Sequence, residues 1–196
     1  MTEEDKSLVV RPTGIRKFNP QAESSLIARG LDALQTLENK NHEANYYYNL
    51  GNTYRQQDRL EEAIEAYNKA IEIKPDYHHA YHNLGNTYRR QGKYDQAIEA
   101  YNKAIEIKPD YHLAYYNLGN AYDEQDKYEE AIEAYNKAIE IMSNDAESYI
   151  NLDYAKEKQG NLDQAIDAYN KAIELKPDNS TYKNNLELAR QLASER

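Results

Sequence analysis

One segment recurs along this chain at a fixed spacing. The residues Ala-Ile-Glu-Ala-Tyr-Asn-Lys-Ala-Ile-Glu-Ile begin at Ala63, Ala97 and Ala131, and a close variant begins at Ala165, so each copy starts 34 residues after the one before it. A period of this length is typical of arrays built from one small helical unit. We therefore predict four units, at residues 44–77, 78–111, 112–145 and 146–179.

Each unit contains two stretches of apolar residues at helical spacing. In the second unit, Tyr81, Leu84 and Tyr88 follow one another after three or four residues, and Ala97 and Tyr101 begin a second series. This spacing places the apolar side chains on one face of a helix. Both stretches are therefore predicted to form amphipathic helices.

The residues between and after these stretches favour helix ends. Gly92 separates the two stretches of the second unit, and glycine readily adopts the left-handed conformation that ends a helix. Pro109 follows the second stretch, where it prevents the helix from continuing. Each unit is thus predicted to be a helical hairpin. Because one hairpin alone leaves an apolar face uncovered, the hairpins are expected to stack side by side as a curved solenoid.

This pattern resembles the tetratricopeptide repeat family over about 136 of the 196 residues. The resemblance depends on an aromatic residue, Leu-Gly and Tyr in the first helix, and on Ala, Tyr, Ala and Pro in the second. In the first unit these residues are Tyr47, Leu50, Gly51, Tyr54, Ala63, Tyr67, Ala70 and Pro75. The resemblance implies an all-α, right-handed α-solenoid of helical hairpins with a C-terminal capping helix.

The fourth unit departs from the pattern at three places. Asp153 stands where the other units have Gly, Lys156 stands where they have Tyr, and Ser143 replaces the Pro of the preceding junction. The small residue and the tyrosine have packing roles in the other units. We therefore expect the junction between the third and fourth units to be the weakest.

The segments outside the four units are interpreted separately. Residues 180–196 carry apolar side chains on one side and polar ones on the other, which predicts a capping helix. Residues 21–43 predict an N-terminal helix, either a cap or a decayed half-repeat. Residues 1–20 contain two Pro and one Gly, and we interpret them as a flexible N-terminal arm.

Composition excludes several function classes. The chain has no Cys, which removes disulfide, thiolate-metal and Cys-nucleophile chemistry and fits a reducing, cytoplasmic setting. Its formal net charge of −10 disfavours nucleic acid and anionic membranes as partners. No residues have a spacing that indicates an enzyme. His78 and His82 lie four residues apart without a third ligand, so we predict no metal site and no cofactor.

The family resemblance implies that the first helices of successive units line a concave groove that binds a peptide. By position, the groove residues are Asn49, Asn52, Arg55, His79, His82, Asn83, Asn86, Arg89, Arg90, Tyr116, Asn117, Asn120, Asp123, Glu124 and Asn151. All seven asparagines fall into two rows, one from Asn49 to Asn151 and one from Asn52 to Asn120. An amide can both donate to and accept from a peptide backbone. The alternative is that packing or repeat duplication accounts for these asparagines.

Charge in this groove is predicted to be polarised. Arg55, Arg89 and Arg90 belong to the first two units, whereas Asp123 and Glu124 belong to the third. A bound chain should therefore place acidic residues near the first two units and a basic residue near the third. We also expect His79 and His82 to become charged as the pH falls through about 6.5.

Members of the family that clamp the C-terminal carboxylate of heat-shock chaperones use Lys and Arg beside asparagines on three first helices. Here Asn52 and Asn83 match, whereas Tyr48, Leu113 and Asn117 occupy the three basic places. A chaperone carboxylate clamp is therefore not predicted.

The sequence thus predicts a non-enzymatic protein–protein interaction module or scaffold. Its expected partner is a protein or peptide with an acidic segment, bound by a monomer. The alternative is a structural protein that assembles by end-to-end stacking, which the near-identity of the units makes geometrically easy.

Overall fold

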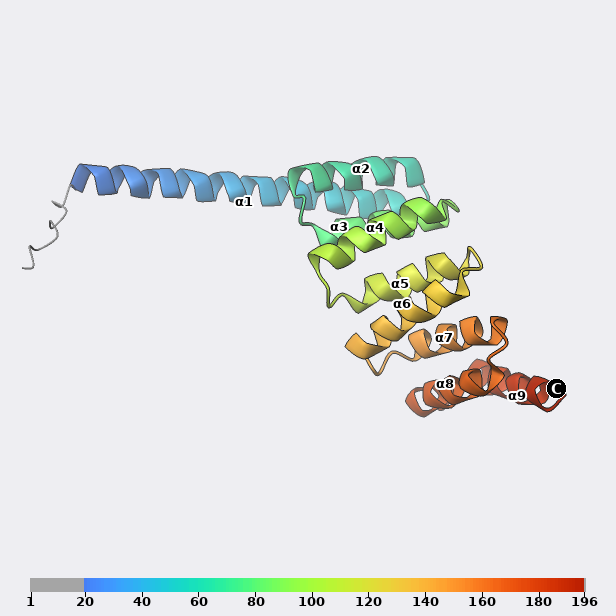
Figure 1. Ribbon diagram of the computed structural model, residues 1–196. Helices are drawn as coiled ribbons and strands as arrows, with labels where there is room; N and C mark the ends of the chain where they lie inside the picture. Colours follow the sequence, from blue (N-terminus) through green and yellow to red (C-terminus); the bar gives the residue numbers. More distant parts are fainter. Residues whose placement is uncertain (1–19, 196) are drawn as a thin grey trace, which may run out of the picture. The chain divides into compact units, whose positions relative to one another are not determined.

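The computed structural model describes residues 20–195, and in this part of the chain the helices are joined by short turns without any strand (Figure 1). Its helices are α1 (Pro20–Gln56), α2 (Leu60–Ile73), α3 (His78–Arg90), α4 (Tyr94–Ile107), α5 (His112–Asp123), α6 (Tyr128–Ile141), α7 (Ala146–Lys158), α8 (Leu162–Leu175) and α9 (Ser180–Ser194). The predicted all-α class is confirmed.

Consecutive helices form hairpins that stack in chain order within Lys40–Arg196 (Figure 1). The turn inside each hairpin has a residue with positive φ: Asp58 (62°), Gly92 (72°), Asp126 (58°) and Gly160 (84°), again 34 residues apart. Gly92 therefore has the left-handed conformation predicted for it. Aspartate takes the same place in two repeats because it tolerates this conformation better than most residues.

The two helices of a hairpin approach closely at a glycine. A Cβ atom on Gly85 would lie 2.6 Å from Cε1 of Tyr101, and a Cβ atom on Gly51 would lie 2.6 Å from Cε1 of Tyr67. The rings of Tyr67, Tyr101 and Tyr135 are buried against these backbones. Glycine therefore allows the close approach of the tyrosine ring in the first three repeats.

The core extends across repeat boundaries. Ala97 and Tyr101 of the second repeat pack with Leu118 and Ala121 of the third, and equivalent clusters join the other repeats. Each hairpin buries an apolar face only because its neighbour covers that face. Stability therefore arises from the stack and not from single repeats.

The capping helix is confirmed at the C-terminal end. In α9, Tyr182, Leu186 and Ala189 are buried, and the side chain of Asn179 caps the helix by accepting hydrogen bonds from two backbone N–H groups. The other face carries Lys183, Asn184, Glu187 and Arg190, all of them exposed. This face stands where another repeat would place its second helix, so polar residues solvate the end of the stack.

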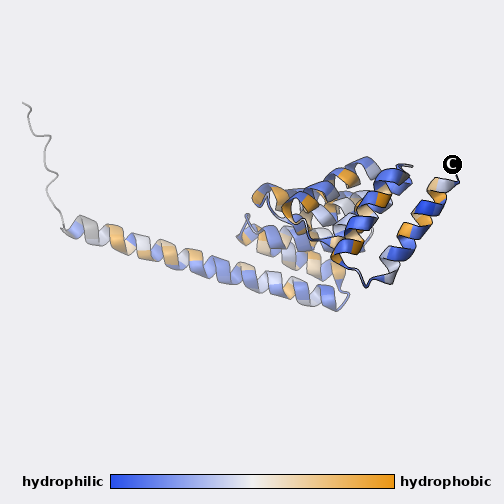
Figure 2. Cartoon of the chain, turned by 90° about the horizontal axis from the view of Figure 1, so that it is seen from below, coloured by the Kyte–Doolittle hydropathy of each residue, from blue (hydrophilic) through white to orange (hydrophobic). Residues whose placement is uncertain are grey.

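The N-terminal part of the chain differs from the expected break near residue 43. Helix α1 continues through that point because residues 31–50 contain neither Gly nor Pro to end it. The described residues up to Asn39 belong to one unit, and those from Lys40 onward belong to another. In that first unit, hydrophobic residues recur along an exposed helix (Figure 2), including Leu31, which is 62% exposed. The predicted arm at residues 1–20 lies outside the described residues except for Pro20, which begins α1.

Candidate interaction surface

Equivalent groove residues lie beside one another because the first helices stack in register. Asn49, Asn52 and Arg55 lie on α1, and their counterparts lie 34 positions later on α3 (Asn83, Asn86 and Arg89) and 68 positions later on α5 (Asn117, Asn120 and Asp123). Asn151 lies on α7, and Glu124 directly follows the end of α5. Hydrogen bonds join residues 31 and 35 positions apart across the repeat boundaries. The structure therefore brings most of the predicted residues onto one surface.

The asparagines of this surface form a ladder. The hydroxyl of Tyr67 donates to Oδ1 of Asn52 at 2.7 Å, and Nδ2 of Asn83 donates to the same oxygen at 2.8 Å. The same Nδ2 lies 3.1 Å from the hydroxyl of Tyr48. The acceptor oxygen of Asn52 is therefore fully used inside the protein.

The third and fourth repeats form the same ladder. Oδ1 of Asn120 accepts from the hydroxyl of Tyr135 at 2.8 Å and from Nδ2 of Asn151 at 2.8 Å. The hydroxyl of Tyr116 also accepts from Asn151 at 3.2 Å. Tyr116 thus links the third repeat to the fourth, as Tyr48, two repeats earlier, links the first to the second.

Between the second and third repeats the ladder changes because His82 replaces the tyrosine. Nδ2 of Asn117 lies 2.9 Å from Nε2 of His82 instead of bonding to Asn86. Oδ1 of Asn86 therefore accepts only one hydrogen bond, from the hydroxyl of Tyr101 at 2.7 Å. In residues 20–195 the amide N–H groups of Asn52 and Asn86 make no hydrogen bond. In both residues the amide oxygen holds a tyrosine hydroxyl inside the protein, while the amide N–H groups are left without a partner among the described residues.

A charged row runs beside the ladder. Nε of Arg55, Nε of Arg89 and Oδ1 of Asp123 are buried without a hydrogen-bond partner in the described part of the chain. Burial, followed by the neighbouring carboxylates Glu124 and Asp126, raises the pKa of Asp123. Arg89 approaches Glu124 only to 3.9 Å. Unpaired buried polar atoms are uncommon, and these three occupy the same place in consecutive repeats.

Arg90 has a different environment from Arg89. Its Nη1 donates to the backbone oxygen of Arg55 at 2.9 Å, and its Nη2 pairs with Asp58 at 2.9 Å. Arg90 therefore joins the second repeat to the end of α1. Glu124 similarly accepts from the hydroxyl of Tyr94 at 3.3 Å, which ties the third repeat to the second.

The expected charging of His82 near pH 6.5 is wrong. His82 is 8% exposed, and burial lowers its pKa to about 4. Its Nδ1 lies 3.4 Å from the hydroxyl of Tyr111. His79 is exposed, with Nδ1 3.3 Å from the same hydroxyl, and partial burial lowers its pKa less. The histidines therefore belong to an aromatic contact and not to a surface that charges together.

Tyr111 is the residue that sequence reasoning missed in this region. Its ring lies 5.2 Å from the rings of His78 and His82 and 5.5 Å from that of His79. The signal was present, because Tyr77 occupies the same place one repeat earlier and donates to Asn45 at 2.7 Å. Loop residues recurring at the repeat period can therefore serve the inter-repeat contact.

Residues 20–195 show neither a metal-binding cluster nor a membrane-spanning helix. No group of three or more His, Cys, Asp and Glu side chains is arranged to hold a metal ion. No helix in this range has the length and apolarity needed to cross a bilayer.

Family models and solved structures both match this chain. A model described as tetratricopeptide repeat matches residues 76–144 and 114–178, and one described as TPR repeat matches residues 51–92. The crystal structure of MamA is 30% identical, with 76% of this chain and 81% of that chain covered and a TM-score of 0.72. The comparison with curated proteins gave no match.

Two further structures are similar. The first TPR of Spaghetti (RPAP3), bound to the HSP90 peptide SRMEEVD, is 27% identical, covers 60% of this chain and 93% of that chain, and has a TM-score of 0.58. YrrB, a TPR protein with an unusual peptide-binding site, is 23% identical over 83% of this chain and 84% of that chain, with a TM-score of 0.69, which shows the fold alone. The repeats, the stacked hairpins and these matches together show that the chain belongs to the tetratricopeptide repeat family of protein-interaction modules.

Proposed function

We propose that the first-helix surface of repeats one to three binds an extended peptide segment of a partner protein. The observation that carries this proposal is the row of unpaired polar atoms on Arg55, Arg89 and Asp123. A buried polar atom without a partner costs about 1–3 kcal/mol. Arg55, Arg89 and Asp123 are only partly buried as whole residues, so a change of rotamer on binding would bring their unpaired atoms within reach of a polar chain laid along the row.

The asparagine ladder supports binding of a backbone. Asn52 and Asn86 each hold a buried tyrosine hydroxyl through Oδ1, which fixes the orientation of the amide. Their free N–H groups can then donate to peptide carbonyl oxygens without first being ordered. The structural role of these asparagines and a binding role are therefore compatible.

The charge of the row sets the ligand class. Arg55 and Arg89 favour acidic residues beside repeats one and two, and Asp123 with Glu124 favours a basic residue beside repeat three. The peptide bound by the similar RPAP3 domain, SRMEEVD, is acidic toward its end. Here the carboxylate clamp is not proposed, because Tyr48 and Asn117 stand at two of its basic places and are engaged in the ladder.

The test uses labelled extended peptides of equal length: one with an acidic half followed by a basic residue, its reversed sequence, and a neutral one. Fluorescence anisotropy should rank the first peptide tightest. Arg55→Glu with Arg89→Glu should weaken its binding about tenfold and flatten the salt dependence.

The matched control is Lys103→Glu with Lys171→Glu, which makes the same charge change on second helices. This variant should bind within about twofold of the native chain. Equal losses in the two variants would mean that net charge and not the groove governs binding. Equal binding of all three peptides would refute the charge polarity.

End-to-end assembly is the competing function, and α9 argues against it. A stacked neighbour would have to cover Lys183, Glu187 and Arg190, which are exposed and charged. We therefore expect sedimentation velocity to give one species of monomer mass at all concentrations tested. A species whose mass grows with concentration would favour assembly.

A further inference from the structure

A hollow lies between the two helices of each of the first three repeats, lined at equivalent positions. In the third repeat it measures about 410 Å³, compared with about 170 Å³ in the second and about 120 Å³ in the first. None of the predicted groove residues lines it. The hollow of the third repeat is therefore a separate surface feature.

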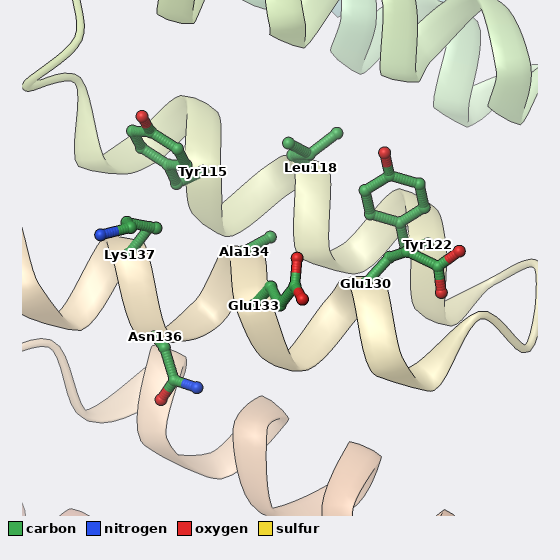
Figure 3. A pocket seen from close by; sticks show the side chains of 8 residues that line it. All are labelled: Tyr115, Leu118, Tyr122, Glu130, Glu133, Ala134, Asn136 and Lys137. Atoms are coloured by element: carbon green, nitrogen blue, oxygen red, sulfur yellow. The ribbon is translucent and has the colours of Figure 1, made fainter.

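The third hollow has an apolar base and an acidic end. Leu118 of α5 and Ala134 of α6 form the base and are buried. Figure 3 shows the ring of Tyr122 at one end, with the carboxylate of Glu130 beside it and that of Glu133 nearer the middle. Both carboxylates, after burial itself, raise the pKa of Tyr122, which reflects how close they lie.

The first repeat shows what this combination of residues binds. The Cζ atom of Arg59 lies 4.4 Å from the centroid of the Tyr54 ring, and its Nε donates to Oε1 of Glu62 at 2.8 Å. Tyr54 and Glu62 line the first hollow at the places that Tyr122 and Glu130 have in the third. The chain thus supplies its own guanidinium to the aromatic–carboxylate pair of repeat one.

The third repeat has the same pair without the guanidinium. Lys127 replaces Arg59, and in residues 20–195 it neither pairs with a carboxylate nor lies over the Tyr122 ring. Glu130 and Glu133 likewise form no ion pair in this part of the chain. The second repeat lacks the full set because Gln96 replaces the first carboxylate, and the fourth lacks it because Lys156 replaces the tyrosine.

We propose that the third hollow binds an arginine side chain of a partner protein. The aliphatic stem would lie on Leu118 and Ala134, and the guanidinium would stack on Tyr122 and donate to Glu130 and Glu133. Arginine fits better than lysine because its planar group both stacks on a ring and donates to two oxygens at once. This site is independent of the proposed groove and would hold a partner from the other side of α5.

The probe is N-acetyl-arginine methylamide, titrated into the ¹⁵N-labelled full chain and followed by amide shifts. The citrulline analogue, which is neutral and nearly the same shape, is the matched control ligand. We expect saturable shifts in residues 115–137 with the arginine probe and at least about fivefold weaker binding of the citrulline probe.

Three variants, all with substitutions at exposed residues, sharpen the test. Glu130→Gln with Glu133→Gln should weaken the arginine probe about fivefold. Lys127→Arg should place an internal guanidinium over Tyr122, as Arg59 does over Tyr54, and so abolish the shifts. Arg59→Lys should open a new, weaker site in repeat one. Equal shifts with citrulline, or binding that Lys127→Arg leaves unchanged, would overturn the proposal.

Discussion

Repeats two and four form the same hairpin, but they differ in the residue at which its two helices come closest. In repeat two, Gly85 lets the ring of Tyr101 contact the backbone, and Asn86 accepts from the tyrosine hydroxyl at 2.7 Å. In repeat four, Asp153 replaces the glycine, and the hydroxyl of Tyr169 reaches only Glu157, at 3.4 Å. Repeat two therefore buries a tyrosine whose hydroxyl makes a good hydrogen bond, whereas repeat four buries an aspartate.

Asp153 is fully buried, and neither of its oxygens has a hydrogen-bond partner among the described residues. Burial raises its pKa to about 9, with Lys156 opposing the rise and Glu157 adding to it. The acid is therefore held neutral at pH 7. A repeat can therefore keep its hairpin when the glycine is replaced. Because the pKa of the buried aspartate is raised, however, that aspartate must bind a proton when the chain folds.

The largest expected effect comes from transferring this feature into repeat two. Gly85→Asp would force a Cβ to within 2.6 Å of Tyr101 and bury a carboxyl group, so urea unfolding should show a loss of about 3–5 kcal/mol. The control is Gly30→Asp, since a Cβ on Gly30 meets nothing within 4 Å. It should change stability by less than about 0.5 kcal/mol. Similar losses in both variants would contradict the role given to close approach.

The second effect is a pH dependence that belongs to repeat four. With a folded pKa of about 9 and an unfolded pKa of about 3.9, Asp153 binds more protons when folded, so stability falls as the pH rises between these values. From pH 6 to 8 the repeat should lose about 2–3 kcal/mol, at about 1.4 kcal/mol per unit. Urea unfolding of the native chain and of Asp153→Asn at both pH values measures this. A slope that Asp153→Asn retains would assign it to other groups.

The third test repairs repeat four. Asp153→Gly with Lys156→Tyr restores the residues of the other repeats and should stabilise the chain by about 1–3 kcal/mol at pH 7. Amide exchange should slow most in α7 and α8. If the native fourth repeat already opens no more readily than the second, the predicted weakness of its junction is wrong.

The smallest effect is the opposite pH response of repeat two. His82 has a folded pKa of about 4 against about 6.5 unfolded, so the unfolded chain binds more protons between these values and stability falls as the pH falls below 6.5. Between pH 6 and 5 the loss should be about 1 kcal/mol. His82→Tyr, which supplies the residue found in repeats one and three, should remove it. Persistence of the slope in that variant would point to His78 or His79.

The sequence by itself determined the repeat, the hairpins and the close approach at Gly51, Gly85 and Gly119. These properties are local or periodic, because helical spacing and helix-ending residues act within a few positions and a repeated motif needs one repeated packing solution. The departures at Asp153 and Lys156 could also be identified without coordinates, because they break the period.

Only the tertiary structure decided which polar residues the protein uses for itself. Asn83 and Asn151 donate hydrogen bonds to the preceding repeat. Arg90 donates to the backbone at the end of α1, whereas Arg89 does not. Burial keeps His82 neutral near pH 6.5. These outcomes depend on atoms 31 to 35 residues apart, whose distances are set by the stacking of hairpins. Identical letters in successive repeats therefore acquire different roles, because each repeat meets a different neighbour.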